Sequence, residues 1–380
     1  MLDRPSGGQA AVLVGLDFGQ DDYAESLEEL KLLALSAGLD PRAVVRGRRD
    51  RPDSALFAGS GKVDEIMRSV TEAGASLVIF NHELSPAQER NLEVALGCRV
   101  IDRVALILDI FAQRAKSHEG KVQVELAQLE HLATRLVRGW SHLERQRGGV
   151  GMRGPGETQL ETDRRLIARR VKLLKEKLER LKSQREVQRR ARARGKTLSV
   201  SLVGYTNAGK STLFNALTHA GAYVADQLFA TLDTTTRRIW LPEAGSLVVS
   251  DTVGFIRDLP TALVAAFRAT LEETIHADLL LHVVDSASPV RDAQILEVDH
   301  VLGELGASDI PQVLVWNKID LKTGTRDVAP EVDRDEYGKI YRVRLSARTG
   351  AGLDGLRQAL TEAATLKNPT VNQKYRVAEA

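Results

Sequence analysis

The alternation of apolar and polar stretches indicates an α/β organisation for residues 1–112, the first of four predicted parts of the chain. Short apolar runs, expected to be strands, occupy 11–16, 43–45, 76–80 and 98–101. Amphipathic stretches, expected to be helices, lie near 24–37, 61–73 and 85–96. Strands that alternate with helices in this way predict a small N-terminal α/β subdomain with a sheet of the parallel type.

Residues 113–196 carry a different, purely helical pattern. Apolar residues recur there at steps of three and four, as one stripe on each of two segments. The first stripe is Val122, Leu126, Leu129, Ala133 and Leu136, and the second is Ile167, Val171, Leu174, Leu178 and Leu181. Two stripes of similar length predict an antiparallel helical hairpin that resembles a coiled coil.

Residues 197–366 begin with an apolar run, 198–203, followed by a glycine-containing loop and a second apolar stretch, 212–217. The loop consists of Gly204, Tyr205, Thr206, Asn207, Ala208, Gly209, Lys210 and Ser211. A strand, such a loop and a helix form the phosphate-binding loop of nucleotide-binding proteins, whose backbone N–H groups converge on phosphate oxygens. We expect Lys210 to reach the β- and γ-phosphates and Ser211 to ligate Mg²⁺.

A second motif selects the base of the nucleotide. Asn317, Lys318, Ile319 and Asp320 follow the apolar run 313–316. A carboxylate at Asp320 can accept two hydrogen bonds from guanine but would stay unpaired against adenine, which favours GTP over ATP. Asn317 and Lys318 are expected to brace the loop and cover the base. Further along, a run at 341–345 precedes three residues expected to hold the guanine through their backbone: Ser346, Ala347 and Arg348.

Two segments between these motifs are expected to sense the γ-phosphate. The first contains Phe229, Ala230, Thr231, Leu232 and Asp233, and the second contains Asp251, Thr252, Val253 and Gly254. Asp251 can hold the magnesium through water, and the Gly254 N–H can meet the γ-phosphate. Thr231 can place its hydroxyl on the magnesium while that phosphate is present, although the run Thr234–Thr236 leaves the choice of threonine open on spacing alone.

The five motifs together predict a GTPase domain with a mostly parallel, six-stranded sheet. We expect the catalytic groups to be Lys210, Thr231 and Gly254. Phe255 occupies the position where many GTPases have a water-orienting glutamine. Intrinsic hydrolysis should therefore be slow. Asn207 resembles the asparagine of potassium-activated GTPases, which would make K⁺ an activator, but it can also simply shape the loop.

Charge is concentrated within the hairpin. Residues 164–196 hold fifteen Lys or Arg against three Glu, a local charge of +12, so the rest of the chain carries −10 of the net +2. Because aromatic residues are almost absent there, the pattern favours contacts with RNA phosphates over base stacking, with a merely solvated face as the alternative. The glycine-rich loop 148–156 is expected to be a probe presented to a partner, or else a plain connector. The RNA-contact candidates are Arg145, Arg147, Gly148, Gly149, Gly151, Arg153, Gly154, Gly156, Arg164 and Arg165.

Other features narrow the class of protein. The single cysteine, Cys98, excludes a disulfide scaffold, and no apolar run or signal core predicts a membrane segment or export, so we expect a cytoplasmic monomer.

Gly59-Ser-Gly-Lys62 resembles half a phosphate-binding loop, but Val63 replaces the serine or threonine. We interpret it as a helix start, with a second nucleotide site as the alternative. His82 is expected to be structural.

The chain resembles the HflX family, ribosome-associated GTPases of the Obg–HflX branch of P-loop GTPases. The resemblance rests on residues 84–92, 101–103, 106–114, 148–165, 204–211 and 229–233. It implies that Thr231 is the magnesium-binding threonine and that the large (50S) ribosomal subunit is the partner. It also implies that the loop 148–156 points towards the peptidyl-transferase region. Ribosomes would stimulate GTP hydrolysis, and the protein would split, rescue or silence ribosomes under stress such as heat.

Two departures from the family pattern limit this expectation. Thr234 stands where members often have proline, and the polar tail 367–380 ends where some relatives continue into a small C-terminal domain. Contacts of that domain are expected to be missing. The alternatives are a non-ribosomal GTP-dependent switch that recruits a protein, and an ATP-driven RNA remodeller.

Overall fold

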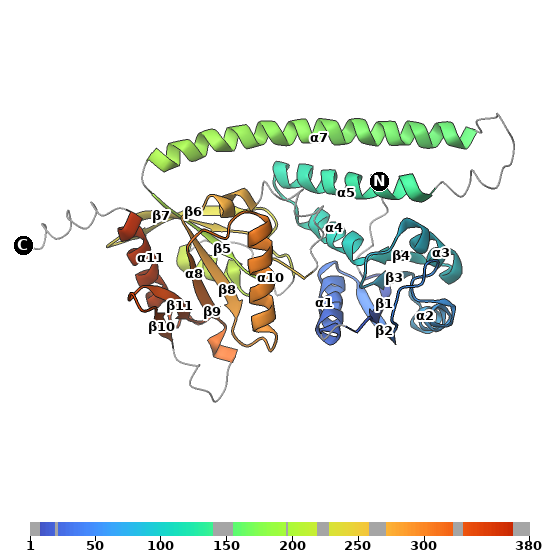
Figure 1. Ribbon diagram of the computed structural model, residues 1–380, viewed down its shortest axis with the longest axis horizontal. Coiled ribbons are helices and arrows are strands. Elements are labelled where there is room, and N and C mark those ends of the chain that lie inside the picture. The colour runs from blue at the N-terminus through green and yellow to red at the C-terminus, as the bar shows by residue number, and fades with distance from the viewer. Residues whose placement is uncertain are drawn as a thin grey trace, which may run out of the picture. The chain divides into compact units, whose positions relative to one another are not determined.

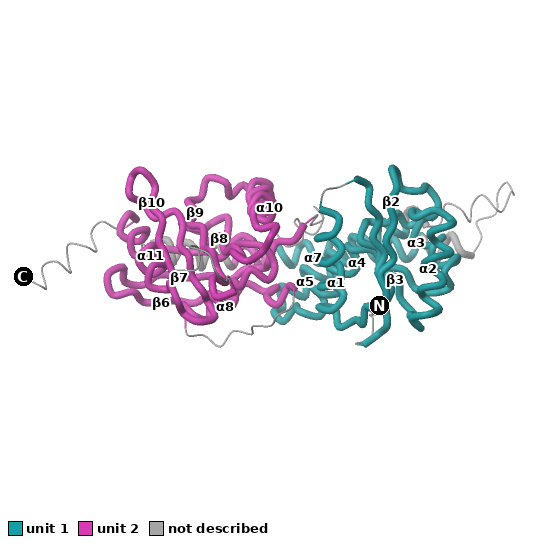
Figure 2. Tube along the Cα trace, turned by 90° about the horizontal axis from the view of Figure 1, so that it is seen from below, with its two compact units in different colours: residues 1–179 teal, residues 180–380 magenta. Residues whose placement is uncertain are grey.

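A computed structural model describes residues 8–19, 22–139, 155–194, 197–218, 228–257, 271–321 and 330–367. The chain forms two compact units, residues 1–179 and 180–380 (Figure 2). Each unit is built around its own sheet. The three-part division into subdomain, hairpin and GTPase domain stays a prediction.

Unit 1 contains a four-stranded parallel sheet with strand order β2-β1-β3-β4. The strands are β1 (Ala10–Asp17), β2 (Asp40–Arg48), β3 (Leu77–Phe80) and β4 (Arg99–Asp102). The helices between and after them are α1 (Tyr23–Ser36), α2 (Ser60–Ala73), α3 (Pro86–Leu96) and α4 (Arg103–Arg114). The expected α/β subdomain is confirmed. The central strands β1 and β3 are buried on both faces, which is why they are continuous apolar runs in the sequence.

Two ambiguous sequence features of unit 1 make contacts within that unit. Gly59 caps the start of α2 with a φ of 79°, and Lys62 pairs with Glu65 and donates to the Arg46 carbonyl. The expected helix start is therefore present. His82 packs edge-on against the ring of Phe18, with 5.1 Å between ring centroids.

The two long helices α5 (His118–Gly139) and α7 (Pro155–Arg194) run antiparallel (Figure 1), as predicted. Their seam is a small cluster in which Val122, Leu126 and Leu174 are buried. Leu129, Val171 and Leu178 pack against these three residues. The first three residues of the first predicted stripe and the middle three of the second therefore make the contact between the two helices.

Unit 2 contains a seven-stranded sheet with strand order β10-β11-β9-β8-β5-β7-β6. The strands are β5 (Leu198–Val203), β6 (Thr235–Leu241), β7 (Gly245–Asp251), β8 (Leu279–Asp285), β9 (Gln312–Asn317), β10 (Glu331–Arg334) and β11 (Ile340–Arg344). Only the edge pairs β6/β7 and β10/β11 are antiparallel within the described part, so the sheet is mostly parallel, as expected. The strand count was expected to be six. The described sheet therefore has one strand more than expected; one of its edge strands, β10, is short and polar, and no apolar run predicts it.

Three helices of the described part of unit 2 are α8 (Lys210–Thr218), α10 (Arg291–Glu304) and α11 (Leu353–Lys367). Buried residues of α8 and α11 pack with residues of the sheet in one hydrophobic core. This core holds β5, β8 and β9 side by side, so the loops that follow their carboxyl ends meet at one edge of the sheet. No helix in the described ranges is long and apolar enough to cross a membrane.

Candidate active site

The loop between β5 and α8 needs glycine at two positions. Gly204 has a φ of 144°, and a Cβ there would lie 2.2 Å from the Val283 carbonyl oxygen. Gly209 has a φ of 95°, and its Cβ would lie 2.2 Å from the Asn317 side-chain nitrogen. Asn207 is also left-handed, with a φ of 60°, a conformation that asparagine tolerates better than most residues. This asparagine therefore shapes the loop whatever else it does.

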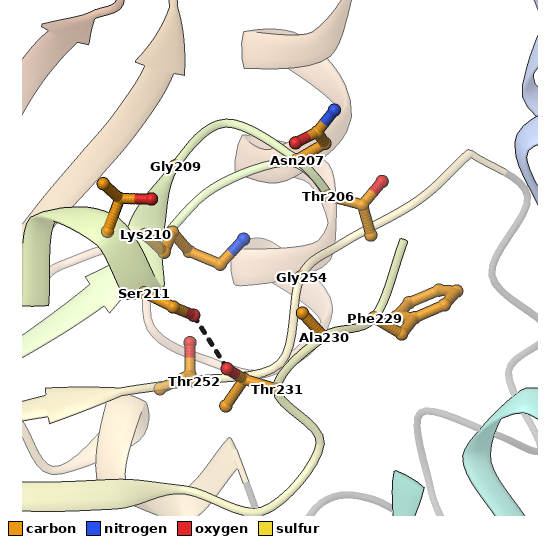
Figure 3. A pocket seen from close by; sticks show the side chains of 11 residues that line it. Thr206, Asn207, Gly209, Lys210, Ser211, Phe229, Ala230, Thr231, Thr252 and Gly254 are labelled. Atoms are coloured by element: carbon orange, nitrogen blue, oxygen red, sulfur yellow. Dashed lines mark hydrogen bonds between the residues drawn. The ribbon is translucent and has the colours of Figure 1, made fainter. Parts of the chain in front are cut away.

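Lys210 is buried at the start of α8 and faces the pocket that this loop encloses (Figure 3). Its Nζ donates to the carbonyl oxygens of Gly204, 2.9 Å away, and Tyr205, 2.8 Å away. Burial lowers the pKa of Lys210 to about 8, and the Asp251 carboxylate acts in the opposite direction. An ammonium group has three N–H donors, so this one can still donate to an anion in the pocket, and that anion would favour the charged form.

Three predicted metal ligands converge close to Lys210. Ser211 Oγ lies 2.7 Å from Thr231 Oγ1 (Figure 3) and donates to Asp251 Oδ2, also 2.7 Å away. Thr231 Oγ1 donates to the same carboxylate oxygen at 3.0 Å. Burial raises the pKa of Asp251, while the hydrogen bond from Ser211 is the largest effect that lowers it. Residues from a helix, a loop and a strand thus meet at one carboxylate.

This set of oxygens fits Mg²⁺. The second oxygen of Asp251, Oδ1, is buried and has no hydrogen-bond partner in the described part of the chain. The described residues contain no group of three or more His, Cys, Asp or Glu that could enclose a metal alone. A hard cation held by one carboxylate and two hydroxyl groups would complete its shell with water and substrate phosphates, as Mg²⁺ does.

The neighbouring threonines are placed elsewhere. Thr235 and Thr236 belong to β6, and Thr236 Oγ1 lies 3.1 Å from Ser250 Oγ. Phe229 and Leu232 are buried on either side of Ala230 and Thr231. The apolar flanks therefore anchor the loop around Thr231. The hydroxyl group that faces Ser211 is that of Thr231, not that of Thr235 or Thr236.

The segment after Asp251 lies against the phosphate-binding loop. Phe255 N donates to the Gly204 carbonyl at 3.1 Å, and Thr206 N donates to the Phe255 carbonyl at 2.7 Å. The Phe255 side chain is fully buried, so it anchors the segment and offers no polar group to the pocket. A Cβ at Gly254 would lie 2.9 Å from Thr206 Cα and 3.0 Å from Lys210 Nζ. Only glycine fits there.

Thr252 and Val253 support this segment from behind. Both side chains are buried, and Thr252 Oγ1 donates to the Leu202 carbonyl at 2.5 Å. The Thr252 hydrogen bond ties the segment to β5. Asp233, at the end of the other expected phosphate-sensing segment, is half-buried.

The expected guanine-binding residues come together at the carboxyl ends of β9 and β11. Asn317 Nδ2 donates to the Ala208 carbonyl, and Ala347 N donates to Asn317 Oδ1, each at 2.9 Å. Asp320 lies exposed in a short 3₁₀ helix (Ile319–Leu321), with Ile319 buried beneath it. Ser346 is buried next to Ala347, and Arg348 is exposed. One asparagine therefore joins the phosphate-binding loop to the loop 346–348.

Sequence reasoning missed the partner of Lys318. The Lys318 ammonium pairs with Asp285 Oδ2 at 2.8 Å, and Lys318 has a φ of 64°. Asp285 ends β8, and β8 and β9 are parallel neighbours. The apolar run 279–284 ends in Asp285, and adjacent parallel strands end at the same side of a sheet. This position of Asp285 in the sequence could have indicated the pair with Lys318.

The RNA-contact candidates fall mostly outside the described residues. Those outside are Arg145, Arg147, Gly148, Gly149, Gly151, Arg153 and Gly154. Gly156, Arg164 and Arg165 belong to α7, and both arginines are exposed. Glu161 and Asp163 are exposed beside these two arginines, so the excess of positive charge on α7 begins only after this end of the helix.

Comparison with known proteins agrees with this geometry. Three family models match in succession: "GTP-binding GTPase N-terminal" at residues 24–112, "GTP-binding GTPase Middle Region" at 114–192 and "50S ribosome-binding GTPase" at 199–318. The chain is 58% identical to a GTPase HflX of Escherichia coli (strain K12), over 95% of this chain and 84% of that protein. It is 48% identical to a GTPase HflX of Caldanaerobacter subterraneus, over 93% and 80%. Among solved structures it is similar to SsGBP in complex with GDP, with 26% identity, a TM-score of 0.53 and coverage of 94% of this chain and 99% of that one.

Proposed function

This chain belongs to the HflX family of GTPases, and we propose that it hydrolyses GTP in the pocket around Lys210 while bound to the large ribosomal subunit. The observation that carries the proposal is that the oxygens of Ser211, Thr231 and Asp251 meet at one point of the pocket that Lys210 also lines. Asn317 ties this pocket to the loop 346–348. The residues expected to bind the phosphates and those expected to select guanine therefore lie at the same end of the sheet, where its parallel strands finish.

In the proposed reaction, water attacks the γ-phosphorus in line with the bond to the β-phosphate oxygen, which breaks to leave GDP and phosphate. Negative charge on the transferred group and on the leaving oxygen is stabilised by fixed donors. Lys210 supplies its remaining N–H, and Gly254 supplies its backbone N–H. Because both groups are positioned before the substrate arrives, they need little reorganisation during the reaction.

Ser211, Thr231 and Asp251 are the residues that would hold Mg²⁺. When bound, the ion neutralises the charge of the β- and γ-phosphates. Thr231 lies on a loop anchored at Phe229 and Leu232, and we propose that its hydroxyl binds the metal only while the γ-phosphate is present. We infer that the GTP state favours binding to the ribosome and that hydrolysis releases the protein.

The proposed site has no side chain to orient the attacking water at the position after Gly254. The Phe255 side chain is fully buried and cannot be a hydrogen-bond partner. We therefore propose slow intrinsic hydrolysis that a ribosome accelerates, with K⁺ beside Asn207 as a second activator. Turnover in potassium and in sodium at equal ionic strength tests the second part: equal rates would exclude K⁺ activation.

The proposed ribosomal partner is supported by the charge of α7 and by the match to the 50S ribosome-binding GTPase model. Arg164 and Arg165 are exposed near the amino-terminal end of this helix, and a dense row of cations is suited to RNA phosphates. We propose that the protein splits, rescues or silences ribosomes under stress, with the loop 148–156 as its probe.

Co-sedimentation with isolated ribosomal subunits tests the proposal. Binding to the large subunit should increase with a non-hydrolysable GTP analogue compared with GDP or an ATP analogue. Binding that is independent of the GTP analogue would contradict it, and binding driven by the ATP analogue would favour an ATP-driven RNA remodeller. A nucleotide-dependent protein partner without ribosome binding would indicate a non-ribosomal switch. Replacing residues 148–156 with a neutral linker should weaken subunit separation more than GTP binding.

A further inference from the structure

Strand β6 forms one edge of the sheet of unit 2 and pairs only with β7 among the described strands. Three consecutive residues of this strand, Thr236, Arg237 and Arg238, are exposed, and Trp240 follows after one buried position. An edge strand with an exposed tryptophan and two arginines is not explained by the core or by the nucleotide pocket.

The Trp240 side chain has 64% of its surface exposed. A Cβ at Gly245, across the hairpin, would lie 3.8 Å and 3.9 Å from the ring atoms Cζ3 and Cη2. The indole therefore rests on the hairpin at a position without a side chain, and its other side faces solvent. Exposed tryptophan is uncommon on a surface without a partner, because the ring has a large apolar area.

The surroundings of this ring are basic, not apolar. Arg238 lies two residues before Trp240, on the same face of the strand. Neither Arg237 nor Arg238 has an ion pair in the described part of the chain, and the nearby acidic residue Glu243 is exposed at the hairpin tip. The buried centre of a protein interface is more apolar than the rest of the surface, and β6 places no second exposed apolar side chain beside Trp240. An aromatic face next to the guanidinium group of Arg238 instead suits a nucleic-acid strand, which offers a base to stack and a phosphate to bind.

We propose that the exposed side of β6 binds unpaired RNA, with a base stacked on Trp240 and a flanking phosphate bound by Arg238 on the same face of the strand. This contact rests on the proposed ribosomal function and adds to it a second RNA surface, on the GTPase unit, distinct from the basic helix α7. The surface is tied to the nucleotide pocket through the backbone. Thr235, the first residue of β6, lies opposite Asp251 of β7 in the antiparallel pair. Thr231 lies four residues before Thr235 in the sequence. RNA bound on β6 would therefore act on the strand that continues directly from the Thr231 loop.

The test uses the full chain and a fluorescein-labelled, mixed-sequence, single-stranded RNA of about twelve nucleotides, followed by anisotropy. Base stacking on an aromatic side chain contributes about 1–3 kcal/mol, so Trp240→Ala should weaken binding about 5- to 150-fold. Trp240→Phe keeps an aromatic face and should retain most of the affinity. Arg238→Ala should weaken binding and reduce its salt dependence. Tyr337→Ala is the matched control, because Tyr337 is 86% exposed at the opposite edge of the sheet.

A second measurement identifies the stacked residue. RNA should quench the tryptophan fluorescence of the unchanged protein, and this quenching should be largely absent in Trp240→Phe. Basal GTP hydrolysis should be the same in all four variants, which shows that they are folded. RNA affinity of Trp240→Ala within twofold of the unchanged protein would overturn the proposal. A loss of ribosomal-protein binding in Trp240→Ala with unchanged RNA affinity would also overturn it, because the ring would then contact protein and not RNA. Either result leaves the co-sedimentation of the unchanged chain with the large subunit unaffected, so the two proposals fail separately.

Discussion

The side-chain amide of Asn317 donates to the Ala208 carbonyl at 2.9 Å, although 109 residues separate them. Through its Oδ1 atom the same side chain accepts from Ala347 N. Asn317 is 2% exposed, so water cannot replace either bond. A single amide therefore fixes the distance between the phosphate-binding loop and the loop expected to hold the guanine.

Replacing this residue, Asn317→Ala, should leave a buried carbonyl and a buried N–H unpaired. Each costs about 1–3 kcal/mol, so we expect GDP and GTP affinity to fall about 10- to 100-fold, as measured with a fluorescent GDP analogue. Asn91→Ala is the control: Asn91 also donates to a carbonyl, that of Ala55, but on the surface of unit 1. Unchanged affinity in Asn317→Ala would show that the two loops are held independently.

The sequence predicted the elements of unit 2 better than their connections. Motifs at strand ends located the pocket, because each motif follows an apolar run that ends at the same edge. The links between motifs were harder: the Lys318–Asp285 pair and the Asn317–Ala208 bond depend on strand order, which local pattern does not contain. Strand β10 was not predicted, for a different reason. Its four residues, 331–334, are polar and pair only at the sheet edge, so no hydrophobic period marks them.

Gly254 should tolerate no side chain. Gly254→Ala would bring a Cβ to 2.9 Å from Thr206 Cα and 3.0 Å from Lys210 Nζ, which displaces the groups expected around the γ-phosphate. We expect single-turnover GTP hydrolysis to fall roughly 100-fold, since one preorganised donor contributes about that much. GDP affinity should change less than tenfold. Gly61→Ala, in helix α2 where a Cβ meets nothing within 4 Å, should change neither. Equal loss of GDP and GTP binding in Gly254→Ala would contradict a role limited to the γ-phosphate.

Restoring the usual glutamine should not restore fast hydrolysis. The Phe255 side chain is fully buried, and its backbone is paired with Gly204 and Thr206 on both sides. Phe255→Gln would therefore bury an amide without partners, which costs at least about 2 kcal/mol of unfolding free energy. Phe255→Leu keeps the site apolar and should cost about 1 kcal/mol. Urea unfolding and intrinsic turnover measure the two effects; faster hydrolysis in Phe255→Gln would show that this position can reach the attacking water.

A buried ion pair should contribute to the stability of unit 1 but not to that of unit 2. Asp102 is fully buried and accepts from Arg135 of α5 at 2.6 Å, and Arg135 also pairs with Glu89. Arg135→Met leaves Asp102 buried without its cation, so unit 1 should lose about 3–5 kcal/mol of stability. Arg170→Met is the matched control, because its pair with Glu125 is exposed and should contribute under about 1 kcal/mol. Hydrogen exchange should accelerate in β4 and α3 but not in unit 2. Faster exchange in both units would show that they unfold together.

His282 should make unit 2 sensitive to mild acid. The imidazole is almost fully buried in β8, and burial lowers its pKa from 6.5 to about 4, with the Lys210 charge acting in the same direction. Asp299 lies 3.8 Å away but is half-exposed, which makes it a weak opposing charge, and a hydrogen bond with Gln312 also opposes the shift. Because the unfolded state takes up a proton below pH 6.5 and the folded state only near pH 4, stability is complete above pH 6.5 and falls as the pH drops towards 4.

The loss between these two pH values should reach roughly 3 kcal/mol, since each pKa unit corresponds to about 1.4 kcal/mol. Urea unfolding at pH 7.0, 6.0 and 5.0 would measure it. His282→Gln should lower stability at neutral pH but flatten its pH dependence in this window. His300→Gln, on the exposed face of α10 with its side chain 69% exposed, should leave the slope unchanged. If His282→Gln keeps the slope of the unchanged protein, the acid sensitivity of unit 2 arises from another group.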